Sequence, residues 1–134
     1  MKIKLIDFGG SAPFRAHYND AGADVYAPYD VNLYPGQVIK LPLGFGIELP
    51  DGFVGFVFPR SSLSSKGIVC ELPPIDAGYR GEIHAIVSNV SVCDYFIRKG
   101  ERIGQLVVMP VMIPEFVSTL GEERQDCAFG SSGK

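Results

Sequence analysis

The segment Phe45-Gly-Ile-Glu-Leu-Pro-Asp-Gly-Phe-Val-Gly-Phe-Val-Phe58 shows how this chain folds. It holds two short runs rich in apolar and aromatic residues, Phe45–Leu49 and Phe53–Phe58, and the intervening Pro50-Asp51-Gly52 favours a turn. Similar short runs recur along the chain at Lys2–Ile6, Val31–Leu33, Gln37–Leu41, Gly81–Val87, Tyr95–Ile97 and Arg102–Val111. Many short strands separated by turns predict an all-β sandwich or barrel.

Helical structure is expected in one short segment. Ser61-Ser62-Leu63-Ser64-Ser65-Lys66 offers serine caps at its start and Gly67 just past its end. The tail that begins at Gly121 is polar and too rich in glycine and serine to pack by itself. We therefore expect a β-barrel domain over residues 1–120 and a flexible C-terminal arm over residues 121–134.

Composition limits the classes of function. A chain of 134 residues with 46% hydrophobic and 20% charged residues has the size and make-up of one globular domain. Its net charge of −3 argues against a nucleic-acid surface, which normally needs a basic patch. No stretch is long enough to span a membrane, and the first residues lack the features of a signal peptide, so a cytoplasmic protein is expected. The three cysteines, Cys70, Cys93 and Cys127, are widely spaced and odd in number, which is typical of free thiols.

Two common kinds of site find no support in the sequence. The histidines, His17 and His84, lie far apart and no paired cysteines accompany them, which argues against a catalytic zinc. The zinc deaminase pattern, His-x-Glu followed by Pro-Cys-x-x-Cys, is absent. No strand leads into a glycine-rich turn and a long helix, so a dinucleotide-binding fold is not expected either.

The segment from Ile75 to Glu82, Ile-Asp-Ala-Gly-Tyr-Arg-Gly-Glu, says most about chemistry. The carboxylate of Asp76 can serve as a base for a water molecule. Ala77 and Gly78 can bend the chain so that Tyr79 lies close to Asp76, and a strand that begins at Gly81 can hold both side chains in place. Taken singly, the same residues are also a common turn.

The segment Pro59-Arg60-Ser61-Ser62-Leu63 can form an anion site. It follows a predicted strand and opens the helical turn, where free amides and the hydroxyls of Ser61 and Ser62 favour anions. The guanidinium of Arg60 has the fork geometry that suits a phosphate. Alternatively, Ser61 caps the helix and Arg60 pairs with a carboxylate.

Three further segments carry polar side chains with two readings each. Gln105, in Glu-Arg-Ile-Gly-Gln-Leu, can reach a phosphate oxygen or simply be solvated. Asp24, in Ala-Gly-Ala-Asp-Val, can orient a hydrated Mg²⁺ or be a turn carboxylate. The tail offers the charge of Arg124, an aromatic lid at Phe129 and the flexible Gly130-Ser131-Ser132-Gly133, or it is an ordinary terminus.

Five of these segments, in this order and at this spacing, resemble the five motifs of the homotrimeric dUTP pyrophosphatases (dUTPases). The resemblance runs from about Ala21 to Gly133. The segments around Asp24, Arg60, Asp76 and Gln105 are similar to the first four motifs, and the tail from Arg124 is similar to the fifth. The resemblance implies a jelly-roll-like β barrel with one short helix, which agrees with the strand pattern.

The resemblance also implies an activity. It is the Mg²⁺-dependent hydrolysis of dUTP to dUMP and pyrophosphate, which limits uracil in DNA and supplies dUMP for thymidylate synthesis. Three chains contribute to each site in this family, so the partners implied are dUTP and two further copies of the chain, without nucleic acid or membrane.

The implied roles follow the motifs. Asp76 would activate the attacking water, and Tyr79 would pack against the deoxyribose and leave no room for a 2′-hydroxyl. The backbone at Ile75, just before Asp76, would read the uracil edge, and Phe129 would close over the base. Asp24 would hold Mg²⁺ through its waters. The phosphates would lie against Arg60, Ser61, Ser62, Gln105, Arg124, Gly130, Ser131 and Ser132.

The chain departs from the family pattern at two places. Leu72-Pro73-Pro74 precedes Ile75, where the family usually has a glycine followed by an aliphatic residue, and proline has no N–H with which to read a base. In the tail, Gln125, Cys127 and Ala128 stand where glycines are common.

Two alternative functions remain open from the sequence. The first is a dCTP deaminase of the same superfamily, with or without a second activity, for which Glu71 or Glu82 would be the carboxylate that activates water at the pyrimidine. The second is a trimeric domain that binds a protein partner with the nucleotide as a switch. Release of ammonia from dCTP distinguishes the first alternative from dUTP hydrolysis.

Overall fold

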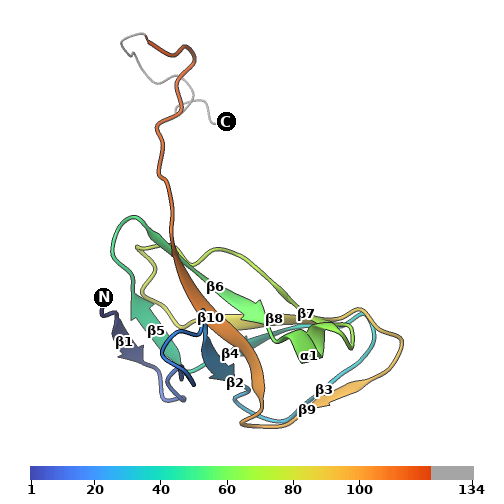
Figure 1. The fold of residues 1–134 in the computed structure, drawn as a ribbon. Helices are drawn as coiled ribbons and strands as arrows, with labels where there is room; N and C mark the ends of the chain where they lie inside the picture. Colours follow the sequence, from blue (N-terminus) through green and yellow to red (C-terminus); the bar gives the residue numbers. More distant parts are fainter. Residues whose placement is uncertain (122–134) are drawn as a thin grey trace.

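The computed structural model describes residues 1–121, which are built almost entirely of short strands (Figure 1). The elements are β1 Lys4–Asp7, β2 Ala23–Tyr26, β3 Val31–Leu33, β4 Val38–Pro42, β5 Phe45–Glu48, β6 Phe53–Pro59, α1 Ser61–Ser64, β7 Ile68–Glu71, β8 His84–Asn89, β9 Tyr95–Ile97 and β10 Arg102–Pro110. The predicted all-β class is confirmed. No helix within residues 1–121 is long and apolar enough to cross a membrane.

Two strands were not predicted, and three begin later than expected: β1 by two residues, β4 by one and β8 by three. Residues Ala23–Tyr26 include Ala and Asp, which are poor strand formers, and they become β2 because they pair with β10. Strand β7 lies between the helical turn and two prolines and gains its pairing from β8. Strand β8 begins at His84 and not at Gly81, because residues 80–83 form the return from the turn at Asp76.

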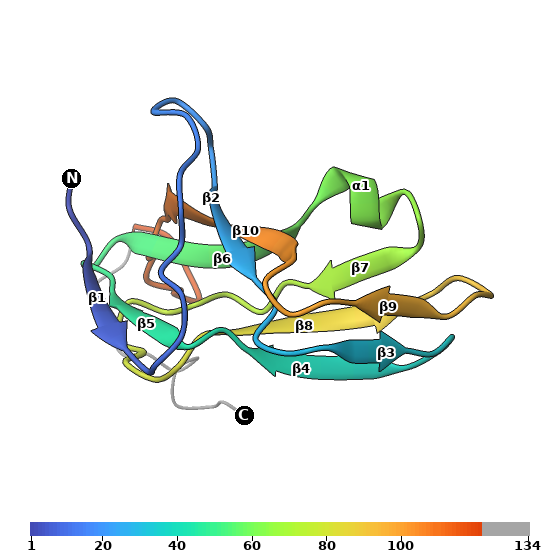
Figure 2. The same cartoon turned by 90° about the horizontal axis from the view of Figure 1, so that it is seen from below.

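The strands form four small antiparallel sheets. Their orders are β1-β5, β2-β10-β6, β3-β9 and β4-β8-β7. Figure 2 shows β2, β10 and β6 on one side of β8 and β4, with β7 next to α1. Most neighbours within a sheet are distant in sequence, so the site residues on them are brought together by tertiary pairing.

The apolar core lies between these sheets. The β2-β10-β6 sheet contributes Val25, Val57, Ile103 and Leu106. The β4-β8-β7 sheet contributes Leu41, Ile68, Ala85 and Val87. Ile103 and Leu41 are each 1% exposed, so the backbones that carry the site residues are tightly packed. Gly52 closes the predicted turn between β5 and β6 with a φ of 88°, a conformation that favours glycine.

The segment after β10 leaves the barrel in an extended conformation (Figure 1). It carries large apolar side chains that contact little of its own chain: Met112 is 85% exposed, Ile113 74% and Phe116 74%. Exposed large apolar side chains that gather in one segment are common where a protein binds a partner.

Candidate active site

A tight turn presents Asp76 and Tyr79 together. The backbone N–H of Tyr79 donates to the carbonyl of Asp76 at 3.0 Å, so Ala77 and Gly78 are the central residues of the turn. The guanidinium of Arg80 donates to the carbonyl of Ala77 and closes the turn from its far side. The expected bend is confirmed, and the carboxylate of Asp76 is exposed to solvent in the single chain.

Ile75 fastens this turn to the barrel. Its N–H donates to the carbonyl of Gly55 in β6 at 2.8 Å, and its carbonyl accepts from the N–H of Gly55 at 3.1 Å. Asp76 therefore follows directly from a point fixed on a core strand. Because both main-chain polar groups of Ile75 are engaged, Ile75 meets the adjacent groove with its side chain.

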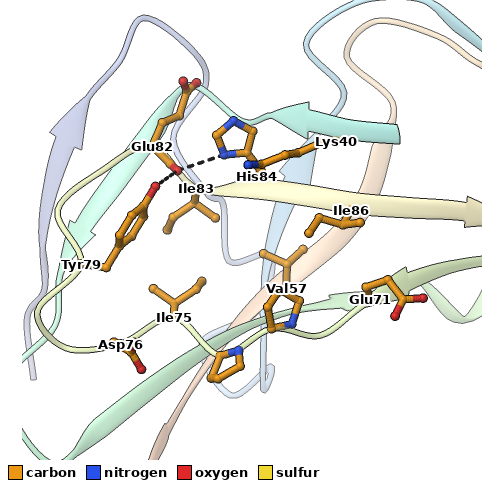
Figure 3. Close-up of a pocket in the computed structure, with 12 residues that line it drawn as sticks. Lys40, Val57, Glu71, Ile75, Asp76, Tyr79, Glu82, Ile83, His84 and Ile86 are labelled. Carbon is orange, nitrogen blue, oxygen red and sulfur yellow. Dashed lines mark hydrogen bonds between the residues drawn. The ribbon is translucent and has the colours of Figure 1, made fainter. Parts of the chain in front are cut away.

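The ring of Tyr79 lies against Gly81 and points toward the backbone of Glu82, as Figure 3 shows for the contact with Glu82. Its hydroxyl donates to the carbonyl of Glu82 at 2.8 Å, and Nδ1 of His84 lies 3.1 Å from the same oxygen. A carbonyl can only accept, so Nδ1 of His84 carries the proton. The carboxylate of Glu82 accepts the N–H of Gly44 at 2.8 Å and anchors the return of the turn.

A groove of about 350 Å³ opens beside this turn, which is the size of a small-molecule site. Lys40, Ile86 and Glu71 face one another across β4, β8 and β7 in register and form part of its floor. The remaining lining residues are Val57, Pro73, Pro74, Ile75, Asp76, Tyr79, Glu82, Ile83 and His84. The groove thus combines an apolar surface with several polar groups.

A second group of predicted residues gathers on the β2-β10-β6 sheet. Gln105 in β10 is the register partner of Asp24 in β2 and of Phe58 in β6, and β6 ends immediately before Arg60. The side chain of Gln105 packs against Gly22, where an added Cβ would lie 2.7 Å from Oε1 and 2.8 Å from Cβ of Gln105. The sheet therefore brings Asp24, Gln105 and Arg60 to one region.

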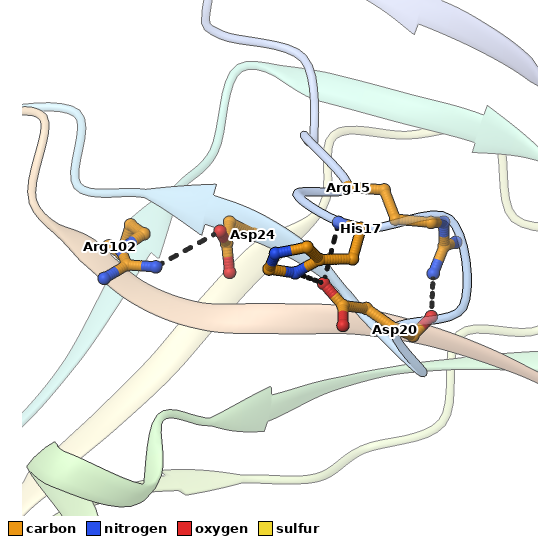
Figure 4. A network of polar contacts seen from close by, with 5 residues as sticks. All are labelled: Arg15, His17, Asp20, Asp24 and Arg102. Atoms are coloured by element: carbon orange, nitrogen blue, oxygen red, sulfur yellow. Dashed lines mark hydrogen bonds and ion pairs between the residues drawn. The ribbon is translucent and has the colours of Figure 1, made fainter.

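Arg102 belongs to this region and was missed from the sequence. Its Nη1 lies 3.5 Å from Oδ2 of Asp24, whose side chain is 20% exposed (Figure 4). Its carbonyl accepts a hydrogen bond from Nη1 of Arg60 at 3.4 Å. A register shift between Arg102 and Gly104 marks a β-bulge, a device that re-aims a side chain. The signal was the arginine three residues before Gln105 in the same motif.

The loop that precedes β2 is also polar and has no predicted role. His17 donates its N–H to Oδ2 of Asp20 at 2.9 Å, and Nδ1 of His17 lies 3.1 Å from the same oxygen (Figure 4). The backbone hydrogen bond from His17 is the main cause that lowers the pKa of the Asp20 carboxyl. Arg15 donates to the carbonyl of Asp20 and closes the loop.

The short helix differs from the expectation in its cap. Arg60 is the N-cap of α1 and makes no side-chain cap hydrogen bond, so the idea that Ser61 caps the helix is wrong. Ser61 and Ser62 are exposed, whereas Leu63 is buried in the core. The two serine hydroxyls thus face outward beside Arg60.

Comparison with known proteins gives a consistent result. A sequence profile of the dUTPase family matches residues 10–133. The deoxyuridine 5′-triphosphate nucleotidohydrolase of Tropheryma whipplei strain Twist is 44% identical, with 100% of this chain and 97% of the relative covered. The corresponding protein of Leifsonia xyli subsp. xyli is 46% identical, with 90% and 84% covered. The chain belongs to the dUTPase family.

Solved dUTPase structures have the same fold. The dUTPase of phage phi11 of S. aureus has a TM-score of 0.84 at 25% identity, covering 92% of this chain and 99% of that chain. The Staphylococcus bacteriophage 80alpha dUTPase has a TM-score of 0.83 at 27% identity, covering 92% and 99%. A structural Mg(II) ion is described for a phi11 variant, and an 80alpha variant is described with dUpNHpp.

Within residues 1–121, the residues similar to dUTPase motifs fall into two groups. Ile75 pairs with one edge of β6, and Gln105 pairs with the other edge. Asp76 and the residues expected to bind phosphate therefore lie on opposite sides of that strand. Neither Asp24, Arg60, Ser61 nor Gln105 lines the groove that holds Asp76 and Tyr79. The predicted tail residues Arg124, Phe129, Gly130, Ser131 and Ser132 lie outside the described residues.

The carboxylate of Asp24 suits a Mg²⁺ ion that binds together with a phosphate ligand. Within residues 1–121, no three His, Cys, Asp or Glu side chains are grouped to hold an ion. Asp24 is a single carboxylate beside Gln105, and its Oδ2 lies 3.5 Å from Nη1 of Arg102. Mg²⁺ keeps several waters and is commonly bound by one or two carboxylates together with substrate phosphates, and a single carboxylate fits that mode.

Proposed function

We propose that this chain hydrolyses dUTP to dUMP and pyrophosphate as a homotrimer with Mg²⁺. The observation that carries the proposal is the placement of Asp76, held by the Ile75–Gly55 pairing and the turn to Tyr79 at the mouth of a groove of nucleoside size. Membership of the dUTPase family supports the substrate. The role in limiting uracil in DNA and supplying dUMP, and a cytoplasmic location, are part of the same proposal.

The proposed reaction is an attack of water on the α-phosphorus. The carboxylate of Asp76 accepts a proton from the water as its oxygen bonds to phosphorus. The bond from the α-phosphorus to the bridging oxygen of the β-phosphate breaks, and pyrophosphate leaves. Tyr79 packs against the sugar, and its hydrogen bond to Glu82 fixes the ring against a 2′-hydroxyl.

The triphosphate carries a high negative charge that cations must balance before water can attack. We assign Arg60, Ser61, Ser62 and Gln105 to its oxygens, because these side chains lie along β6, α1 and β10 with exposed or half-buried donors. Arg102 joins them through its contacts with Asp24 and Arg60. Asp24 would hold a hydrated Mg²⁺, which supplies positive charge to the phosphates when it is bound.

The shared site follows from the two groups of residues. A single chain presents Asp76 and Tyr79 in the groove and the phosphate residues elsewhere, so a second copy is proposed to supply the missing half. The exposed apolar segment around Met112, Ile113 and Phe116 is suited to bind a neighbouring copy. The domain over residues 1–120 would then form the trimer body. The arm over residues 121–134, with Arg124, Phe129, Gly130, Ser131 and Ser132, would close over a site.

The test is release of pyrophosphate from dUTP, dCTP, dTTP and UTP with Mg²⁺, with ammonia measured in the same tubes. Pyrophosphate from dUTP with no ammonia is expected. Asp76→Asn should lower kcat by roughly 10²–10⁴-fold, the usual contribution of a general base, while the molar mass in light scattering stays that of a trimer. Ammonia from dCTP would favour the deaminase, and a folded trimer inactive on all four nucleotides would refute the proposal.

A further inference from the structure

The wall of the groove that precedes Asp76 offers no backbone N–H to a base. Pro73 and Pro74 line the groove, and proline has no amide hydrogen. The N–H of Ile75 is already donated to Gly55 at 2.8 Å. A pyrimidine carbonyl placed against this wall would therefore meet carbonyl oxygens and apolar surface. This inference rests on the proposed function, in which the groove receives the base.

Two of the polar side chains in the groove are committed elsewhere. The hydroxyl of Tyr79 donates to the carbonyl of Glu82 at 2.8 Å. Nδ1 of His84 donates to the same oxygen at 3.1 Å. Neither the hydroxyl of Tyr79 nor Nδ1 of His84 can donate to a base carbonyl while these contacts persist.

Lys40 is the one Lys or Arg side chain among the described residues that line the groove. It is exposed on β4, faces Ile86 directly across the ladder and is the diagonal neighbour of His84 (Figure 3). Diagonal neighbours on one sheet face lie close enough for long side chains to reach across. Among the described residues, no hydrogen bond or ion pair engages its ammonium, which can donate three hydrogen bonds.

We propose that Lys40 determines base specificity in this enzyme by donating a hydrogen bond to the 4-carbonyl of the pyrimidine. It supplies from β4 the donor that Pro73 and Pro74 cannot supply from the main chain. A cytosine would turn its 4-amino group toward the ammonium, so two sets of donors would face each other without an acceptor. Lys40 thus favours uracil over cytosine.

The experiment compares kcat/KM for dUTP and dCTP in the wild type, Lys40→Met, Lys40→Arg and the control Lys4→Met. Lys4 is an exposed strand lysine on β1, outside the groove. Both nucleotides carry the same triphosphate, so their ratio isolates recognition of the base. Where dCTP is not turned over, its inhibition constant against dUTP replaces kcat/KM.

Lys40→Met should reduce the preference for dUTP by about 10- to 100-fold, as expected for loss of a charged donor. Lys40→Arg should keep most of the preference, and Lys4→Met should keep all of it. An equal fall for both nucleotides, or no change in Lys40→Met, would overturn the inference. If the wild type fails to hydrolyse dUTP, the proposed function fails first, so the two failures are distinguishable.

Discussion

A single methyl group at Gly81 should displace the ring of Tyr79. A Cβ at this position would lie 2.5 Å from the hydroxyl oxygen and 2.7 Å from Cζ of Tyr79. Ordinary contact begins at 3.4 Å, so the ring must retreat by about 0.9 Å. That shift strains or breaks the 2.8 Å hydrogen bond to Glu82. A misplacement of about 1 Å at a site can cost roughly 10²-fold in rate, and we expect Gly81→Ala to lose about that much kcat/KM for dUTP.

The discrimination between dUTP and UTP is the more specific readout. If the ring excludes a 2′-hydroxyl by its position, Gly81→Ala should lower the dUTP/UTP ratio of kcat/KM more than it lowers stability. The matched control is Gly78→Ala, because a Cβ at Gly78 meets nothing within 4 Å. Both variants are compared by steady-state kinetics and thermal unfolding. Equal dUTP/UTP ratios in Gly81→Ala, Gly78→Ala and the wild type would refute the role given to the Tyr79 position.

Three further predictions follow from packing and burial. Gly22→Ala should displace Gln105, since the new Cβ would lie 2.7 Å from its Oε1 and 2.8 Å from its Cβ, so KM for dUTP should rise and the unfolding midpoint should fall; an unchanged KM would contradict this. Asn89→Ala should lower the free energy of unfolding by about 2–4 kcal/mol, because Asn89 is 1% exposed and its side chain makes four hydrogen bonds. Denaturant unfolding at fixed protein concentration measures this change, and a loss below about 1 kcal/mol would contradict the prediction. Burial raises the pKa of the Cys70 thiol to about 11, so this thiol should react slowly at pH 8. In a Cys127→Ser variant, the exposed Cys93 should therefore be alkylated before Cys70, and faster labelling of Cys70 would contradict this.

The strands that were predicted from the sequence are those with a strong local signal. Val31–Leu33 and Tyr95–Ile97 have the predicted bounds, and Phe53–Pro59 differs from its prediction by one residue, because β-branched and aromatic runs end at clear turns. Ala23–Tyr26 carries a weak local signal, and its strand conformation is imposed by hydrogen bonds to β10. Pairing partners far apart in the sequence leave no local trace.

In the candidate site too, features encoded by neighbouring residues were predicted, and features set by tertiary contacts were not. The turn at Asp76 was predicted correctly because it is encoded by neighbouring residues. Arg102 was missed because its importance lies in a 3.5 Å contact with Asp24 across a sheet. The engagement of Ile75 with Gly55 was equally invisible, since it depends on where β6 runs.

Base specificity and catalysis depend on different parts of this fold. The groups proposed to carry out the reaction lie in short motifs, where each residue is fixed by its neighbours, as Tyr79 is by Gly81. The groove floor comes instead from register, which places Lys40 of β4 opposite Ile86 of β8. A substitution on β4 can therefore alter the groups that face a base and leave the turn that carries Asp76 intact. The loss of amides at Pro73 and Pro74 can be compensated from a different strand, without any change in the catalytic motif.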